Sequence, residues 1–194
     1  MKKLLLVSII LTTILAAGCG QNADVAGSAD ANEASAVAEV DNSLISNYNI
    51  FTITSDNLKN GQWDDVISST DKGENHSPQL SWEPVEGATS YMVYMVDTSM
   101  VNWIHWKSSD ITETTLPEGW ADKSEYVGPW PPEGGSHTYE IYVLALKNPV
   151  ERMKGSLNSQ NQKFDSFIES ADTDANGNTG NIVGAAHIVG TFTN

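Results

Sequence analysis

The sequence places an imidazole and a phenol directly after a proline-rich loop. His137 and Tyr139 have the same parity along a predicted strand, so their side chains point to the same face. An imidazole and a phenol can donate hydrogen bonds to a phosphate or a carboxylate. The preceding loop holds Pro129, Pro131 and Pro132, which fix the backbone and remove amide donors, so the loop can form a stiff wall. The stiff loop and the two polar side chains beside it together predict a small pocket.

The remaining polar motifs predict no metal site. His76 and His187 have no His, Cys or acidic residue at a metal-ligand spacing, so we interpret them as a loop residue and a strand residue. Residues 172–178 imitate the start of a calcium-binding loop, with oxygen-bearing residues at alternate positions and glycine at the sixth. The twelfth position is Val183, where that loop requires a glutamate. We therefore expect a polar surface loop, and neither a metal nor a cofactor.

The motifs of nucleophilic catalysis are missing from the sequence. There is no Gly-x-Ser-x-Gly turn, no phosphate-cradling glycine loop and no His-Glu-x-x-His sequence, so we do not expect an enzyme. A hydrolase built from His105, His137 and Ser99 is the catalytic alternative. On the residues alone, His105 in the sequence Trp-Ile-His-Trp is equally compatible with a buried, hydrogen-bonded core histidine.

Strands are the main elements predicted to position these residues, which makes the domain mostly β. Turn residues separate segments rich in β-branched and aromatic side chains. The predicted strands are 49–55, 89–96, 103–107, 137–146 and 185–193. Residues 91–96 are apolar on both parities, which predicts a central strand covered on both faces. Helical periodicity is limited to residues 163–169 and, more weakly, 181–186, so helices should be few and peripheral.

The first 18 residues have the pattern of a bacterial export signal. Two lysines precede an apolar stretch that is shorter than the roughly 20 residues of a membrane-spanning helix, the alternative interpretation. The sequence Leu-Ala-Ala-Gly-Cys at residues 15–19 resembles the lipobox of bacterial lipoproteins. This resemblance implies cleavage before Cys19 and lipid attachment to its thiol. We therefore expect an exported protein that the lipid on Cys19 anchors to the bacterial cell membrane.

Composition separates a tether from a folded domain. Residues 19–47 contain no basic and no aromatic residue, which predicts a disordered acidic tether; a short amphipathic helix near residues 31–40 is the alternative. Residues 48–194 are the predicted domain, and without a second cysteine it depends on its core. Removing two lysines with the signal changes the formal charge from -15 to -17 (-15 - 2), which argues against nucleic acid as a partner.

Five short motifs follow one another in a distinctive order. They are Gly-Glu-Asn-His-Ser-Pro-Gln-Leu-Ser-Trp at residues 73–82, Val-Asp at 96–97, His-Trp at 105–106, Gly-Pro-Trp-Pro-Pro at 128–132 and His-Thr-Tyr at 137–139. In this order and spacing the chain resembles the phosphatidylethanolamine-binding protein family, whose bacterial branch is called Raf-kinase-inhibitor-like, over roughly residues 48–194. The resemblance implies a large antiparallel sheet packed on a smaller sheet, with a few flanking helices.

The resemblance also implies a small anion-binding pocket at one end of the sheet. By position in the motifs, the residues that would form it are Asp97, Ser99, His105, Gly128, Pro129, Trp130, Pro131, Pro132, His137 and Tyr139. Family members carry Asp-Pro-Asp-Ala-Pro where this chain reads Asp-Thr-Ser-Met-Val at residues 97–101. Ser99 thus replaces a carboxylate that would orient a histidine or bind an ammonium group, which weakens the case for an ethanolamine head group. The stretch from Asp97 to His105 is also short, which would open the pocket.

The sequence as a whole predicts a surface lipoprotein that binds a small anionic group. Phosphate, a phospholipid head group and a carboxylate are the candidate ligands. A protein-interaction module, such as an inhibitor of an exported protease, is the alternative, and a hydrolase is the less favoured one. Exposed Trp103, Trp120 and Trp130 would mark an interaction surface, whereas buried tryptophans would serve only the core.

Overall fold

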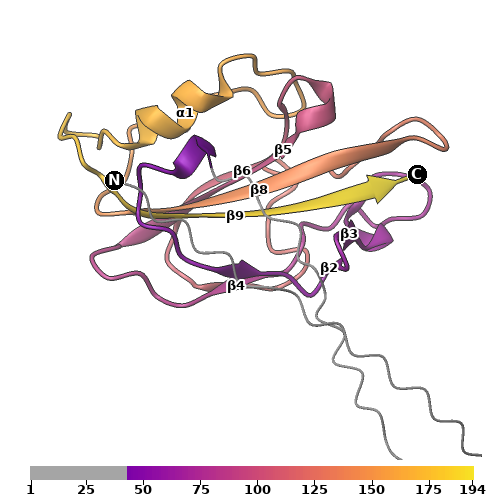
Figure 1. Ribbon diagram of the computed structural model, residues 1–194. Coiled ribbons are helices and arrows are strands. Elements are labelled where there is room, and N and C mark those ends of the chain that lie inside the picture. Colours follow the sequence, from indigo (N-terminus) through magenta and orange to yellow (C-terminus); the bar gives the residue numbers. More distant parts are fainter. Residues whose placement is uncertain (1–42) are drawn as a thin grey trace, which may run out of the picture. The chain divides into compact units, whose positions relative to one another are not determined.

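The computed structural model describes residues 43–194, which form two sheets and one α-helix (Figure 1). The helical elements are the 3-10 turns η1 (Ser43–Ile45), η2 (Asp65–Ile67) and η3 (Thr98–Met100), and the helix α1 (Phe164–Ala171). The strands are β1 (Ile53–Thr54), β2 (Leu58–Lys59), β3 (Gln62–Trp63), β4 (Leu80–Trp82), β5 (Ser90–Asp97), β6 (Trp103–Ile111), β7 (Thr115–Leu116), β8 (Ser136–Leu146) and β9 (Ile182–Thr193). Cys19, with the predicted signal and most of the predicted tether, lies outside the described residues.

The large sheet has six strands in the order β2-β3-β9-β8-β5-β6, and the small sheet has three in the order β1-β4-β7. All pairs are antiparallel except β3 with β9, which run parallel at a single register pair. The long strands β9, β8 and β5 lie next to one another inside the large sheet, and the long strand β6 forms its edge beside β5. The fold is therefore the predicted mostly β one, with a large sheet packed on a smaller one.

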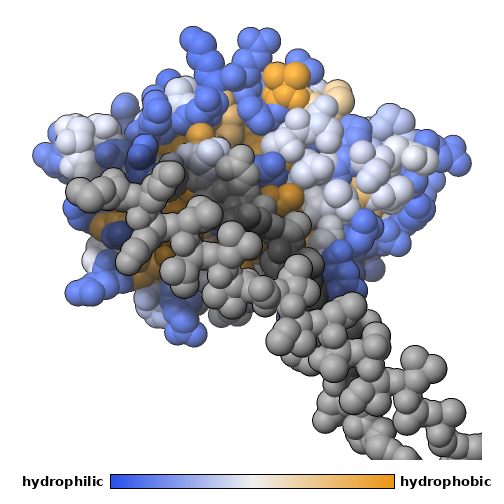
Figure 2. All heavy atoms as spheres, in the orientation of Figure 1, coloured by the Kyte–Doolittle hydropathy of each residue, from blue (hydrophilic) through white to orange (hydrophobic). Residues whose placement is uncertain are grey.

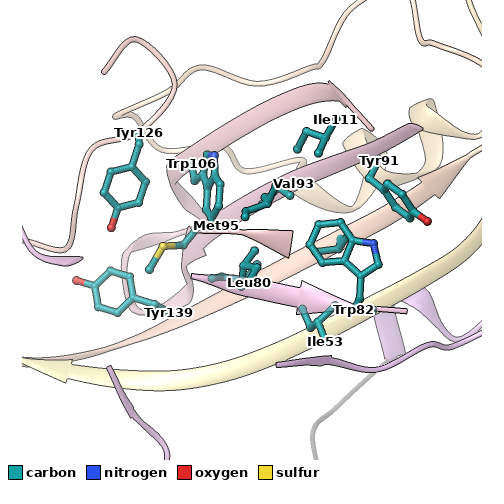
Figure 3. Close-up of a cluster of buried hydrophobic side chains, with 14 of the residues drawn as sticks. Ile53, Leu80, Trp82, Tyr91, Val93, Met95, Trp106, Ile111, Tyr126 and Tyr139 are labelled. Atoms are coloured by element: carbon teal, nitrogen blue, oxygen red, sulfur yellow. The ribbon is translucent and has the colours of Figure 1, made fainter. Parts of the chain in front are cut away.

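Two apolar layers cover the large sheet, one on each face. On one face, β5 and β8 pack against the small sheet through a cluster that includes Val93, Leu80 and Trp82. Figure 3 shows this cluster, with Tyr126 and Tyr139 at one end and Trp82 at the other. On the opposite face, α1 buries Phe164 and Ile168 on the sheet (Figure 1). This double cover explains why every residue of β5 is buried.

Most of the predicted elements are present, and two differ. The predicted helix at residues 163–169 is α1, and β5 is covered on both faces as expected, although it lies next to the edge strand β6. The weak helical pattern at residues 181–186 is wrong, because this segment begins β9 and pairs with β8. Residues 49–55 form only the short β1 and a bridge from Ile50 to Ala185. Pairing with β8 outweighs local periodicity at residues 181–186.

The surface shown in Figure 2 is mostly hydrophilic at its outline, with apolar residues visible between the polar ones. This agrees with a chain that has 25 acidic and 10 basic residues. Within residues 43–194, no helix is both long enough and apolar enough to cross a membrane.

Candidate functional site

The ends of β5, β6 and β8 meet at a cavity of about 640 Å³. We call it the histidine pocket, because His105 and His137 both line it together with Asp97. The pairing of β5 with β8 sets Asp97 opposite Tyr139, and His137 lies two residues further along the same face of β8. His137 and Tyr139 therefore share one face, as their parity predicted.

The carboxylate of Asp97 holds His137 in place. Nδ1 of His137 donates a hydrogen bond to Oδ2 of Asp97 over 2.6 Å, while Oδ1 of Asp97 accepts the amide hydrogen of Ser99 at 2.8 Å. Asp97 is buried, and both of its oxygens are occupied by these donors. Nε2 of His137 has no hydrogen-bond partner in the described part of the chain, so it is the ring nitrogen left for a ligand.

A bulge in β6 brings His105 into the same pocket. Met95 pairs with Trp106 and the adjacent Val96 pairs with Ile104, which leaves His105 as the extra residue. Bulges of this kind redirect a side chain that strict alternation would place elsewhere. Nδ1 of His105 donates to the carbonyl oxygen of Val127 over 2.6 Å.

The chemical state of His105 follows from its burial. Burial lowers the pKa of His105, and it outweighs the carbonyl of Val127 and the charge of Asp97, which act in the opposite direction. At neutral pH the imidazole is therefore uncharged. With Nδ1 donating to Val127, Nε2 is a hydrogen-bond acceptor, and no residue in the range 43–194 supplies it with a donor.

The ring of Tyr139 lies between the two imidazoles. Its centroid is 5.2 Å from that of His105 in an edge-on contact and 6.4 Å from that of His137 in a stacked one. The hydroxyl is buried and has no hydrogen-bond partner within the described residues. Burial, and then the negative charge of Asp97, raise the pKa of Tyr139 far above its usual value, so the phenol keeps its proton. Tyr139 is thus a buried, neutral phenol whose ring contacts both histidines.

The wall of the pocket is braced by the loop that contains the first family-like motif. Asn75 accepts the amide hydrogen of Gly128 at 2.6 Å, and the amide of Ser69 donates to the carbonyl of Pro129 at 3.0 Å. A side chain at Gly128 would collide with the backbone of Ile67 and Ser69. The close approach of these two loops therefore requires glycine at position 128.

The structure brings most of the predicted site residues together. Those that line the pocket are Asp97, His105, Gly128, Trp130, Pro132, His137 and Tyr139. Pro129 and Pro131 are buried in the loop and do not line the cavity. Ser99 does not line it either, since its hydroxyl accepts the amide hydrogen of Thr138 at 3.0 Å and bonds to neither histidine. Ser99 therefore fastens η3 to β8.

One expectation about Ser99 needs correction. The carboxylate that Ser99 replaces was expected either to orient a histidine or to bind a ligand ammonium group. In the structure Asp97 orients His137 directly, so His137 has an orienting carboxylate without an acid at position 99. The reason is the antiparallel register of β5 and β8, which the residue types alone do not reveal.

Sequence reasoning missed five lining residues, most of them apolar or weakly polar. They are Ser69, Met100, Trp103, Val127 and Asn158, of which only Trp103 was singled out, for a different role. Met100 reaches the pocket because it lies in the short connection between β5 and β6. In this connection Val101 and Asn102 adopt φ values of 54° and 53°. Val101 is strained there, because β-branched residues avoid this region. Asn158 comes from a distant loop that no local pattern links to the site.

The remaining histidines and the acidic loop lie apart from the pocket. His76 is in a loop with Nδ1 3.3 Å from Glu118, and His187 lies on β9 with Nε2 donating to Glu140 at 3.1 Å. In the loop at residues 172–178, Asp174 is buried rather than on the surface. Its carboxylate accepts the backbone amides of Asn176 and Asn178. Residues 43–194 contain no group of three His, Cys, Asp or Glu side chains that could hold a metal ion.

Comparison with known proteins gives a consistent result. The family model described as "Phosphatidylethanolamine-binding protein" matches residues 54–193. Among solved structures, Escherichia coli YbcL, described as a member of the mammalian PEBP family, superposes with a TM-score of 0.56 at 24% identity, covering 74% of this chain and 98% of that one. A putative phosphatidylethanolamine-binding protein homologue from Chlamydia trachomatis, CT736, gives a TM-score of 0.54 at 23% identity, covering 75% and 99%. No curated protein matches the chain.

Proposed function

Because the chain belongs to the phosphatidylethanolamine-binding protein family, we propose that it is a binding protein whose histidine pocket takes up a small anionic group. The observation that carries this proposal is the 2.6 Å hydrogen bond from His137 to the buried Asp97, inside a largely apolar cavity. It fixes the imidazole and leaves Nε2 facing the ligand space. In the protonated state of His137, Nε2 donates a charge-assisted hydrogen bond to an oxyanion, and Asp97 balances the positive charge.

The second histidine selects among anions. Neutral His105 offers an acceptor at Nε2, so the favoured ligand presents an acceptor to His137 and a donor to His105. A phosphate monoester that retains one P–OH group satisfies both, and so does a phosphate linked to an ammonium group. A simple carboxylate supplies acceptors only. The phosphate classes are therefore favoured over acetate-like ligands.

The apolar walls indicate that the anion is part of a larger molecule. Met100, Trp103, Val127 and Trp130 surround the polar groups, and the lining includes neither lysine nor arginine. A cavity of about 640 Å³ lies within the range of small-molecule sites and exceeds the volume of a phosphate ion. The low local polarity also strengthens the hydrogen bonds to the histidines. We therefore assign the space beside the phosphate to an organic group attached to it.

The test is a titration of the full chain with phosphoethanolamine, inorganic phosphate and acetate. Tryptophan fluorescence reports binding directly, because Trp103 and Trp130 line the pocket, and the melting temperature rises with RT ln(1 + [L]/Kd). Both phosphates should bind more tightly than acetate. His137→Gln should weaken phosphoethanolamine binding at least about tenfold, which corresponds to one lost charge-assisted bond. The matched control is His76→Gln, because the His76 side chain lies beside Glu118 and does not line the pocket, and this variant should bind as the wild type does.

Two results would contradict the proposal. One is that neither phosphate shifts the melting temperature or the fluorescence at tens of millimolar. The other is that His137→Gln and the His76→Gln control have equal affinities. Equal affinities for acetate and phosphate would contradict only the role assigned to His105.

We extend the proposal to the location of the protein: lipid on Cys19 would hold the domain at the bacterial membrane. The support is the lipobox-like sequence at residues 15–19, which lies outside the described part of the chain. Cys19→Ser should move the protein from the membrane fraction to the soluble fraction. Retention of this variant in the membrane fraction would contradict the anchor.

A protein-interaction module is the second candidate, and one feature of the pocket rim favours it. Trp130 is 74% exposed, and Met100 and Val101 are 40% and 50% exposed. Such a rim suits the apolar side chain of a partner, for example an exported protease inhibited by the domain. Inhibition of a protease by the wild type that Trp130→Ala abolishes, while phosphate binding persists, would favour this candidate. Trp103 and Trp120 are only partly exposed, and Trp120 packs against the core.

A further inference from the structure

A second cavity, of about 730 Å³, lies beside β6 and the loop that precedes α1. Three of its lining residues are basic: Lys107 on β6, and Arg152 and Lys154 on the loop. We call this site the cationic hollow. Its lining contains one acid, Glu125, so the formal charge of the lining is +2 (3 - 1). The whole chain, by contrast, carries a formal charge of -15.

Within residues 43–194, these three cations have no ionic partner. The described residues pair Lys59 with Asp64 at 2.9 Å, but they place no carboxylate within 4 Å of Lys107, Arg152 or Lys154. Glu125 is engaged elsewhere, since its Oε2 accepts a hydrogen bond from Ser108 over 2.6 Å. In a chain with 25 acidic residues, three unpaired cations around one cavity form a local reversal of charge.

Packing of the loop against β6 explains the position of only one of the three basic residues, Lys107. Nζ of Lys107 donates to the carbonyl oxygens of Gly155 at 2.8 Å and Met153 at 3.4 Å, so this lysine fastens the loop to β6. Burial lowers the pKa of Lys107, and the positive charge of Arg152 lowers it further, which means that the two cations repel each other. Neither Arg152 nor Lys154 makes a side-chain hydrogen bond inside residues 43–194. The proximity of Arg152 to Lys107 therefore has an electrostatic cost, and no carboxylate among residues 43–194 lies within 4 Å of either side chain to offset it.

A compact polyanion would offset that cost. Arginine presents a planar donor fork that matches phosphate oxygens, and each lysine adds a point charge. The lining also contains Ser156 and Asn161, and the ring of Phe167 forms one apolar side. We propose that the cationic hollow is a second binding site, independent of the histidine pocket, for a small polyanion with at least two negative charges, such as a pyrophosphate group.

The two sites differ in their expected dependence on salt. Arg152 is exposed and Lys154 is partly exposed, so solvent ions screen this attraction. Polyanion binding should therefore weaken severalfold when salt rises from about 20 to about 150 mM. Binding in the buried histidine pocket should change much less over the same range.

The experiment is calorimetric titration of the full chain with pyrophosphate at low salt. The double variant Arg152→Gln/Lys154→Gln should weaken binding at least about tenfold and leave phosphoethanolamine binding to the histidine pocket unchanged. Lys72→Gln/Lys123→Gln changes the net charge equally at two exposed positions that line neither cavity, and it should change the affinity less than about twofold. His137→Gln should leave pyrophosphate binding to the cationic hollow intact.

Three results would overturn the second site. The first is the absence of binding heat from pyrophosphate up to tens of millimolar. The two double variants could lose equal affinity, which would reduce the effect to the overall charge of the chain. Finally, His137→Gln could abolish pyrophosphate binding, which would assign it to the histidine pocket. A failure of phosphoethanolamine binding alone would contradict the proposed function and leave this inference standing.

Discussion

The histidine pocket and the cationic hollow share strand β6 but differ in how their polar side chains are held. His105 and Lys107 are two residues apart on β6, and the loop at residues 153–161 contributes Asn158 to one cavity and Gly155 to the other. In the histidine pocket, the half-buried His137 and the buried His105 are fixed by hydrogen bonds to Asp97 and Val127. In the cationic hollow, the side chains of Arg152 and Lys154 are unpaired among the described residues and reach solvent.

This difference has a physical consequence. A buried, preorganised donor or acceptor loses little freedom when a ligand arrives, so it discriminates by geometry. Flexible exposed cations attract any compact anion, and their attraction depends on salt. Under our two proposals, β6 therefore lies between a selective site and a less selective one.

The largest expected effect comes from a change that should destroy the first site and spare the second. In Gly128→Ala, the added methyl group would meet the carbonyl oxygen of Ile67 and the amide of Ser69. Overpacking against backbone should lower the free energy of unfolding by about 3 kcal/mol and displace the pocket wall. Chemical denaturation measures the first effect, and phosphoethanolamine titration measures the second.

The control for this change is Gly134→Ala. An added methyl group at Gly134 meets no atom within 4 Å, and the left-handed φ of 73° alone should cost about 1 kcal/mol. Pyrophosphate binding to the cationic hollow should persist in both variants. Equal destabilisation of the two variants would contradict the close packing assigned to Gly128.

An intermediate effect is expected from Asn161, which supports both sites. Its side chain accepts from the amide of Ser156 and donates to the carbonyls of Ser156 and Ser159, and the same loop pairs with Ile104 next to His105. Asn161→Ala should therefore cost about 2 kcal/mol and weaken both phosphoethanolamine and pyrophosphate binding severalfold. The exposed Asn176→Ala is the control for unfolding and for both titrations. Loss at one site only would show that the loop does not couple them.

The smallest expected effect is a change in the pH dependence of the free energy of unfolding when His105 is replaced. Since the pKa of folded His105 is lowered, the unfolded chain takes up a proton first as the pH falls below about 6.5. The stability is therefore full above that pH and decreases toward the lowered pKa, with a slope of up to about 1.4 kcal/mol per pH unit. His105→Gln should remove this part of the slope in urea denaturation between pH 5 and 7.5. An unchanged slope would contradict a buried neutral His105.

Lys107 has a dependence of the same sign in a more alkaline pH range, which separates the two regions by pH. Its pKa is lowered as well, so the folded lysine releases its proton before the unfolded one when the pH rises. Stability should therefore increase as the pH passes the lowered pKa and approaches the ordinary value of 10.5. Acid thus forces a charge onto the buried His105, whereas alkali removes the charge of Lys107.

Local sequence patterns were sufficient to predict those elements whose structure depends on the residues of a single segment. The apolar run in β5 predicted a strand covered on both faces, and the periodicity of residues 163–169 predicted α1. The parity of His137 and Tyr139 predicted that they face the same way, and the prolines predicted a loop outside the sheets. In each case the information lies within a few neighbouring residues.

Local sequence patterns failed where pairing between distant segments determines the conformation or the position of a residue. Residues 181–186 resemble a helix in isolation, but they extend β9 because β8 offers a full ladder of partners. Ser99 was expected to line the pocket, whereas its hydroxyl is occupied by the amide of Thr138 on the neighbouring strand. The cationic hollow was not predicted, because Lys107 is separated from Arg152 and Lys154 along the chain.

The sequence by itself determined a mostly β domain with an acidic surface, and a histidine and a tyrosine beside a stiff loop. Composition, alternation and proline chemistry are properties of neighbouring residues, so they can be interpreted without a structure. Only the tertiary structure decided that a bulge turns His105 toward His137, that Asp97 orients His137, and that three cations converge near β6. These features depend on strand register and loop docking, which bring together residues that are far apart in the chain.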